Sequence, residues 1–149
     1  MKYTEEISNK LNELLVKNYD AEKGYENAAE NVDSDRLKMF FKRRSTERGQ
    51  FANEIKNEIR QYGEEPKDSG SFKGTVHRNW MTLKSTFSGN NEEAVLEEAI
   101  RGEKASLEEY DALITEKNLP PTIDAMILKH RNAIQAALNT DKLNEDIVS

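Results

Sequence analysis

Apolar side chains recur at alternating spacings of four and three residues along four long stretches of the chain, and this pattern predicts amphipathic helices. No stretch shows the two-residue alternation that is typical of a half-buried strand. The expected helices cover about residues 4–32, 34–62, 91–116 and 121–143. The sequence therefore predicts an all-α fold, a four-helix bundle that forms a single domain over residues 1–149.

The lengths of the connections predict how these helices are arranged. Only a few residues separate the first helix from the second, so these two should be antiparallel neighbours. The second and third helices are joined by residues 63–90, which include a short stretch of helical spacing from Phe72 to Phe87. A helix of about 28 residues is about 42 Å long, and a connector of this length can travel back along it. We therefore expect a long crossover that contains a short helix and makes the second and third helices parallel.

The composition is typical of a helix-rich protein with a strongly charged, hydrated surface. Charged residues make up 34% of the chain and hydrophobic residues 36%, and the absence of cysteine excludes disulfide and thiolate chemistry. The first residues lack the apolar core of a signal peptide, and no run approaches the roughly 18–20 apolar residues that span a bilayer. We expect a cytoplasmic, bacterial-type protein with no membrane partner.

The charge of the chain is unevenly distributed. The net charge of −6 argues against nucleic-acid binding, but residues 34–62 hold eight basic and four acidic residues, whereas residues 91–116 hold two basic and nine acidic ones. We expect these stretches to complement each other or neighbouring subunits, which favours a homo-oligomer. No aromatic residues interleave with the cluster Lys42-Arg43-Arg44 on an exposed face, so no nucleic-acid partner is expected.

Polar residues interrupt the apolar face of each expected helix near its middle. A charge inside a bundle is costly unless it is paired or binds a metal. Because the middles of neighbouring helices in a bundle meet, these side chains should form one polar layer. Its expected members are Asn18, Glu22, Arg44, Glu47, Arg48, Gln50, Glu103 and His130.

Several motifs carry a resemblance to known proteins. They are Gly24-Tyr25-Glu26-Asn27-Ala28-Ala29-Glu30, Glu47-Arg48-x-x-Phe51-Ala52-x-Glu54-Ile55, Gly70-Ser71-x-x-Gly74-x-x-His77-Arg78-x-Trp80-x-x-Leu83-Lys84 and Arg101-Gly102-Glu103. With these motifs and its long crossover, the chain resembles ferritin-like four-helix-bundle proteins. More narrowly, it is similar to an uncharacterised bacterial family defined as a domain of unknown function. The resemblance implies a ferritin-like bundle, and it implies no particular activity.

The di-iron pattern of ferritin-like bundles matches the polar layer only in part. Glu22, Glu47 and Glu103 fit carboxylate positions, and His130 fits the histidine of the last helix. Two expected ligands are replaced, a histidine of the second helix by Gln50 and a glutamate of the fourth helix by Ile127.

Arg44 and Arg48 bring two permanent positive charges to the same region and can neutralise carboxylates by bidentate hydrogen bonding. We therefore favour a salt-bridge network with no catalytic residue and no resident cofactor. An iron or manganese site at Glu22, Glu47, Glu103 and His130 remains the alternative.

These patterns predict a non-enzymatic bundle with a degenerate metal site and a structural, stress-associated or partner-binding role. The stress association follows from family analogy alone. The alternative hypothesis is a metal-binding protein or an oxidase that uses the glutamates and the histidine of the polar layer.

Overall fold

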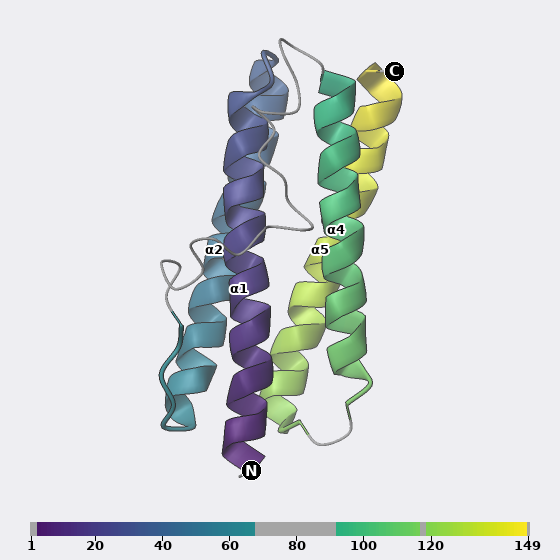
Figure 1. The fold of residues 1–149 in the computed structure, drawn as a ribbon. Helices are drawn as coiled ribbons and strands as arrows, with labels where there is room; N and C mark the ends of the chain where they lie inside the picture. Colours follow the sequence, from purple (N-terminus) through teal and green to yellow (C-terminus); the bar gives the residue numbers. More distant parts are fainter. Residues whose placement is uncertain (1–2, 68–91, 117–118, 149) are drawn as a thin grey trace.

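The computed structural model describes residues 3–67, 92–116 and 119–148, and the chain forms four long helices within these ranges (Figure 1). They are α1 (Tyr3–Glu30), α2 (Asp35–Gln61), α4 (Glu92–Ile114) and α5 (Pro121–Val148). The described residues contain no strand. The prediction of an all-α four-helix bundle is therefore confirmed. The short helix expected within the crossover lies outside the described residues.

The helices form two antiparallel pairs, α1 with α2 and α4 with α5 (Figure 1). Ser34 caps the start of α2, because its hydroxyl accepts a hydrogen bond from the backbone N–H of Leu37 over 3.3 Å. The end of α2 is closed by Gly63 at a φ of 75°, a left-handed conformation that favours glycine. Figure 1 also shows α2 and α4 running in the same direction.

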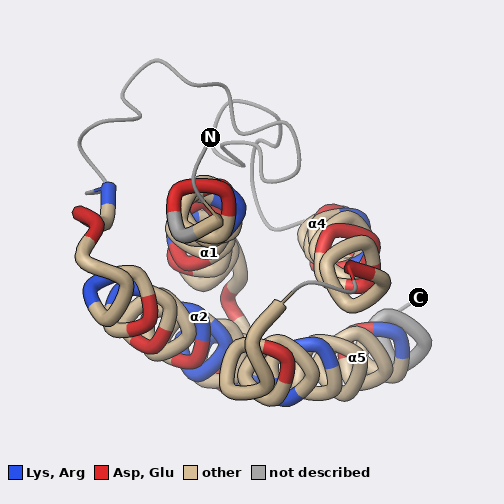
Figure 2. The backbone as a smooth tube through the Cα atoms, turned by 90° about the horizontal axis from the view of Figure 1, so that it is seen from below, with Lys and Arg blue, Asp and Glu red and all other residues tan. Residues whose placement is uncertain are grey.

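Viewed along the bundle, α1 lies beside α2 and α4, and α5 lies beside α2 and α4, and charged residues occur along all four helices (Figure 2). Two apolar clusters fill the interior. One joins the N-terminal half of α1, the C-terminal half of α2 and the N-terminal half of α5. The other joins the opposite halves of α1 and α2 to the start of α4. The polar layer lies between these clusters.

The last helix extends further than the sequence predicts. Residues 144–149 were expected to fray, yet α5 continues to Val148. Asn144 is buried and its amide oxygen accepts a hydrogen bond from the guanidinium of Arg36 on α2. The prediction is wrong for the described part of this tail, because the helix continues and Asn144 packs against α2. None of the helices in the described ranges is both long enough and apolar enough to cross a membrane.

Candidate functional site

Arg48 lies at the centre of the polar layer and joins three helices. Only 2% of its surface is exposed. Its Nη2 donates to Glu103 Oε1 of α4 over 2.7 Å, and its Nη1 donates to Asn18 Oδ1 of α1 over 2.9 Å. Burial is the largest single effect and disfavours the charged guanidinium, but the Glu103 carboxylate together with Tyr110 and Tyr25 raises the pKa of Arg48 by more. The side chain is therefore a permanent, fully enclosed cation.

A chain of hydrogen bonds continues from this arginine to the surface. The Asn18 amide donates to the hydroxyl of Tyr110 over 3.0 Å, and this hydroxyl lies 2.9 Å from His130 Nδ1. His130 Nε2 lies 3.2 Å from Glu54 Oε1, and the other Glu54 oxygen accepts from Lys129. Because Tyr110 accepts from the amide, its own hydrogen can be given to Nδ1, which leaves Nε2 to donate to Glu54.

His130 is held as a neutral imidazole inside this chain. Its ring is fully buried and stacks on Phe51 of α2 with 3.9 Å between ring centroids. Burial lowers the pKa of His130 to about 4, although the hydrogen bond that Nε2 donates to the Glu54 carboxylate acts in the opposite direction. Both ring nitrogens already have protein partners, so neither points to an open coordination position.

Arg44 and Glu47 form a second ion pair at the edge of the layer. The Arg44 guanidinium donates to Glu47 Oε1 over 3.3 Å and lies over the ring of Phe40. Partial burial raises the pKa of Glu47, and the two nearby arginines act against this rise. The sequence predicts that the two arginines pair with Glu22, Glu47 and Glu103. This pairing is confirmed for Glu47 and Glu103, whereas neither arginine forms an ion pair with Glu22 in the described part of the chain.

Asp141 belongs to the layer but was not identified from the sequence. Its side chain is fully buried on α5, and burial together with the charge of Glu103 raises the pKa of its carboxyl group to about 8. The hydroxyl of Tyr25 on α1 interacts with both Asp141 and Glu103. A signal existed, because Asp141 continues the inward spacing of His130 and Ile134.

Glu22 lies outside this interior network. It lines an outer polar groove between α1 and α2, where burial and the charge of Glu26 raise the pKa of its carboxyl group. A Cβ atom on Gly49 would lie 2.7 Å from Glu22 Oε2, so the glycine lets this carboxylate approach the backbone of α2 closely. Gln50 is exposed and lines the same groove.

The axial register of α4 against α5 keeps Glu103 and His130, which the sequence predicts to share one site, apart from each other. Tyr110 is the α4 residue that meets His130, whereas Glu103 interacts with Asp141. His130 and Asp141 are about 16 Å apart along the helix axis at 1.5 Å per residue. The structure therefore brings Glu47 and Glu103 to Arg44 and Arg48. His130 is linked to Arg48 only through Asn18 and Tyr110, and Glu22 lines the outer groove.

These residues do not fit a two-metal centre. Among the described residues, no group of three histidine, cysteine, aspartate or glutamate side chains is arranged to hold a metal ion. A guanidinium occupies one oxygen of Glu103, and Ile127 is buried in the apolar cluster. A cation beside Arg48 would also meet like charge in a region of low dielectric.

Residues 6–116 match the family described as domain of unknown function DUF2383. The chain belongs to this family. The match includes the helices that carry Asn18, Arg48 and Glu103, while α5 with His130 and Asp141 lies beyond it. No curated protein matches the chain. Membership of a family of unknown function, expected from the sequence motifs, is confirmed, and the ferritin-like and bacterial assignments remain proposals.

Proposed function

We propose that this chain is a non-enzymatic, ferritin-like bundle protein in which Arg48 takes the position that a metal ion has in related bundles. In this proposal it is a cytoplasmic bacterial protein that associates with itself and has a structural or partner-binding role. The observation that supports the proposal is the buried guanidinium of Arg48, which hydrogen-bonds Asn18 and Glu103.

The chemistry of the layer supports a structural role. A buried charge is tolerated when it is paired and its hydrogen bonds are satisfied. Arg48 meets both conditions through partners on two other helices, so it defines which residues of α1, α2 and α4 face one another. Tyr110 and His130, the groups best suited to acid–base chemistry, are buried and bonded to each other.

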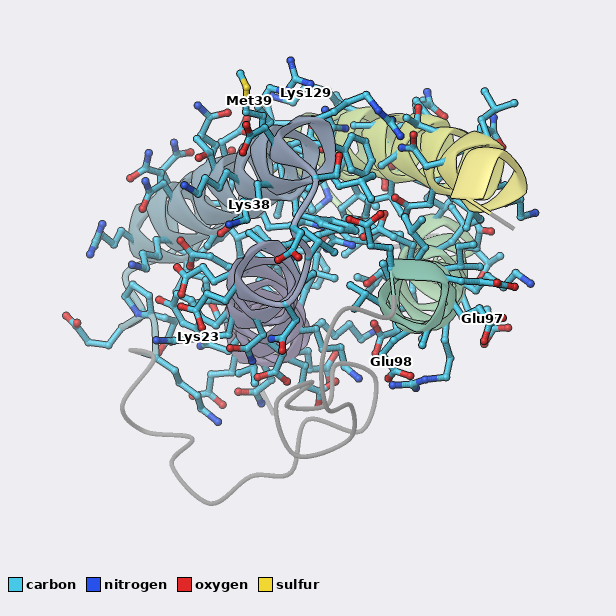
Figure 3. The ribbon with its side chains drawn as sticks, turned by 90° about the horizontal axis from the view of Figure 1, so that it is seen from above. Lys23, Lys38, Met39, Glu97, Glu98 and Lys129 are labelled. Atoms are coloured by element: carbon cyan, nitrogen blue, oxygen red, sulfur yellow. The ribbon has the colours of Figure 1, made fainter. Side chains whose placement is uncertain are left out.

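Exposed apolar side chains support the proposed self-association. Met39 on α2 is 61% exposed and Leu143 on α5 is 64% exposed. The hydrogen bond between Arg36 and Asn144 places these two side chains at the same level of neighbouring helices. Met39 points away from the bundle at the outer edge of α2 (Figure 3). Light scattering over a range of protein concentrations tests the proposed self-association. The double variant Met39→Lys with Leu143→Lys should be a monomer.

A competing hypothesis is an iron or manganese protein, or an oxidase, that uses Glu22, Glu47, Glu103 and His130. One observation favours it, since the second carboxylate oxygen of Glu103 is buried and makes no hydrogen bond. The ion would have to displace Arg48 from Glu103 to bind there.

Metal content distinguishes the two hypotheses. The protein should be purified without a chelating tag, analysed for its elements and titrated with Fe²⁺ and Mn²⁺. We expect no stoichiometric metal in the wild type and none in Glu103→Ala. A stoichiometric ion that is lost in Glu103→Ala would overturn the proposal and establish the competing one.

A further inference from the structure

Several buried polar atoms without a hydrogen bond gather at one place between the helices. They are Arg44 Nε, Glu103 Oε2 and both carboxyl oxygens of Asp141. Tyr25 completes the group, because its hydroxyl interacts with Glu103 and Asp141. The four side chains come from α1, α2, α4 and α5, one from each helix. Three of the four atoms are acceptor oxygens, whereas the donors of the group are the Arg44 N–H and the Tyr25 hydroxyl, so acceptors outnumber donors.

The charges of this region balance only if one acid is neutral. Arg44 and Arg48 supply two positive charges, whereas Glu47, Glu103 and Asp141 would supply three negative ones. Glu47 pairs with Arg44, and Glu103 pairs with Arg48. Asp141 is fully buried and, among the described residues, forms no ion pair; Arg44 and Arg48, which act on it from α2, are already paired with Glu47 and Glu103. A proton on Asp141 removes the excess charge and turns one acceptor into the missing donor.

Among the residues that the structure describes, the part of α5 that carries Asp141 makes few apolar contacts. The residues that α5 contributes to the apolar clusters lie between Ile123 and Ile134. The cluster at the other end of the bundle is built from α1, α2 and α4. Past Ile134, α5 presents buried Ala137 and Leu138 and the contact of Asn144 with Arg36. Segments with few apolar contacts open locally at a low free energy.

We propose that Asp141 is a protonation-controlled lock: as a neutral acid it holds the C-terminal half of α5 in the bundle, and its ionisation releases that half. The groups that face it are Tyr25 from α1, Arg44 and Arg48 from α2, and Glu103 from α4. Burial and Glu103 keep the carboxyl group protonated up to about pH 8, because they raise its pKa to about 8. The lock operates whether or not the bundle has a metal-binding ancestor, so it goes beyond the proposed function.

Native-state hydrogen exchange from pH 5 to pH 9 tests the lock, with protection factors corrected for the intrinsic exchange rates. An exposed aspartate ionises near pH 3.8, so local opening of α5 should release one proton across this range. We expect the protection of amides 138–144 to fall about tenfold per pH unit up to about pH 8 and then to level off. In Asp141→Asn, which is neutral at every pH, the same amides should show no such fall. Asp124→Asn, an exposed substitution on the same helix, should retain the wild-type slope.

Three results would overturn the lock. The first is protection of amides 138–144 that does not change with pH in the wild type. The second is protection of the same amides that falls with pH in Asp141→Asn as steeply as in the wild type. If that variant does not fold, carboxyl ¹³C titration of wild-type Asp141 replaces it, and a pKa near 3.8 would reject the proposal. The third is protection by Mn²⁺ in the wild type but not in Asp141→Asn, which would make the site a cation site. The first two results concern Asp141 and leave the pairing of Arg48 untouched, so the lock and the proposed function can fail separately, whereas Mn²⁺ binding would contradict both.

Discussion

Arg48 and Glu103 form an ion pair across 2.7 Å in which both side chains are almost completely buried. One lies on α2 and the other on α4, two helices that are far apart in the sequence. A buried pair of this kind is costly to break, because the remaining partner keeps its charge without solvent.

Arg48→Met should therefore lower the free energy of unfolding by about 3–5 kcal/mol. Urea denaturation monitored by circular dichroism measures the change, with Arg43→Met as a control on an exposed residue of α2. The double variant Arg48→Met with Glu103→Leu should recover most of the loss, since apolar residues can replace a buried ion pair at little cost. If the double variant is less stable than Arg48→Met, the ion pair is not the source of the loss.

Tyr110→Phe removes the hydroxyl that links Asn18 to His130. Two buried polar groups then lose their shared partner, and we expect a loss of about 1–3 kcal/mol in the free energy of unfolding. Tyr19→Phe is the matched control, because the Tyr19 hydroxyl donates an exposed hydrogen bond to the carbonyl oxygen of Lys67. If the two substitutions lower the free energy of unfolding equally, the buried chain of hydrogen bonds through Tyr110 has no special role in stability.

The pH dependence of stability should have two parts of opposite sign. The pKa of His130 is lowered from 6.5 to about 4, so the stability that depends on its neutral form is lost as the pH falls from 6.5 to 4. The pKa of Asp141 is raised from 3.8 to about 8, so the stability that depends on its neutral form is lost as the pH rises over that range.

The two effects should largely cancel between pH 4 and pH 6.5 in the wild type. Between pH 6.5 and pH 8 only Asp141 acts, and stability should fall by about 1.4 kcal/mol per pH unit. Urea denaturation at a series of pH values measures the profile. In Asp141→Asn stability should instead rise from pH 4 to pH 6.5, and a falling profile there would contradict the assignment.

Gly49→Ala tests the close approach of Glu22 to α2. Alanine favours the helix by about 1 kcal/mol over glycine, but its Cβ would lie 2.7 Å from the end of the Glu22 side chain. This end is flexible and borders the groove, so we expect a net gain of roughly 0.5 kcal/mol in thermal denaturation. In a Glu22→Ala background, Gly49→Ala should raise stability by the full helix preference of about 1 kcal/mol. A loss of stability in that background would show that another group obstructs a side chain at position 49.

Much of the fold follows from spacing alone. Alternating intervals of four and three residues mark the four helices, and the short turn at Ser34 makes α1 and α2 antiparallel. The polar layer and the pairing of arginines with carboxylates also followed from the sequence, because charges on an apolar face need partners wherever the helices meet.

The partners within the layer were decided by tertiary packing. Aligning the helices by their middles places His130 near Glu103, but α5 extends to Val148 and its register pairs His130 with Tyr110. The position of Asp141 beside Glu103 depends on the same register. Periodicity determines which face of a helix is buried, whereas the axial offset between two helices depends on how all their side chains interlock. For this reason the sequence determined that a charged layer exists. Only the packed bundle decided that Arg48 lies at its centre, bonded to Asn18 and Glu103, and that Asp141 lies beside Glu103.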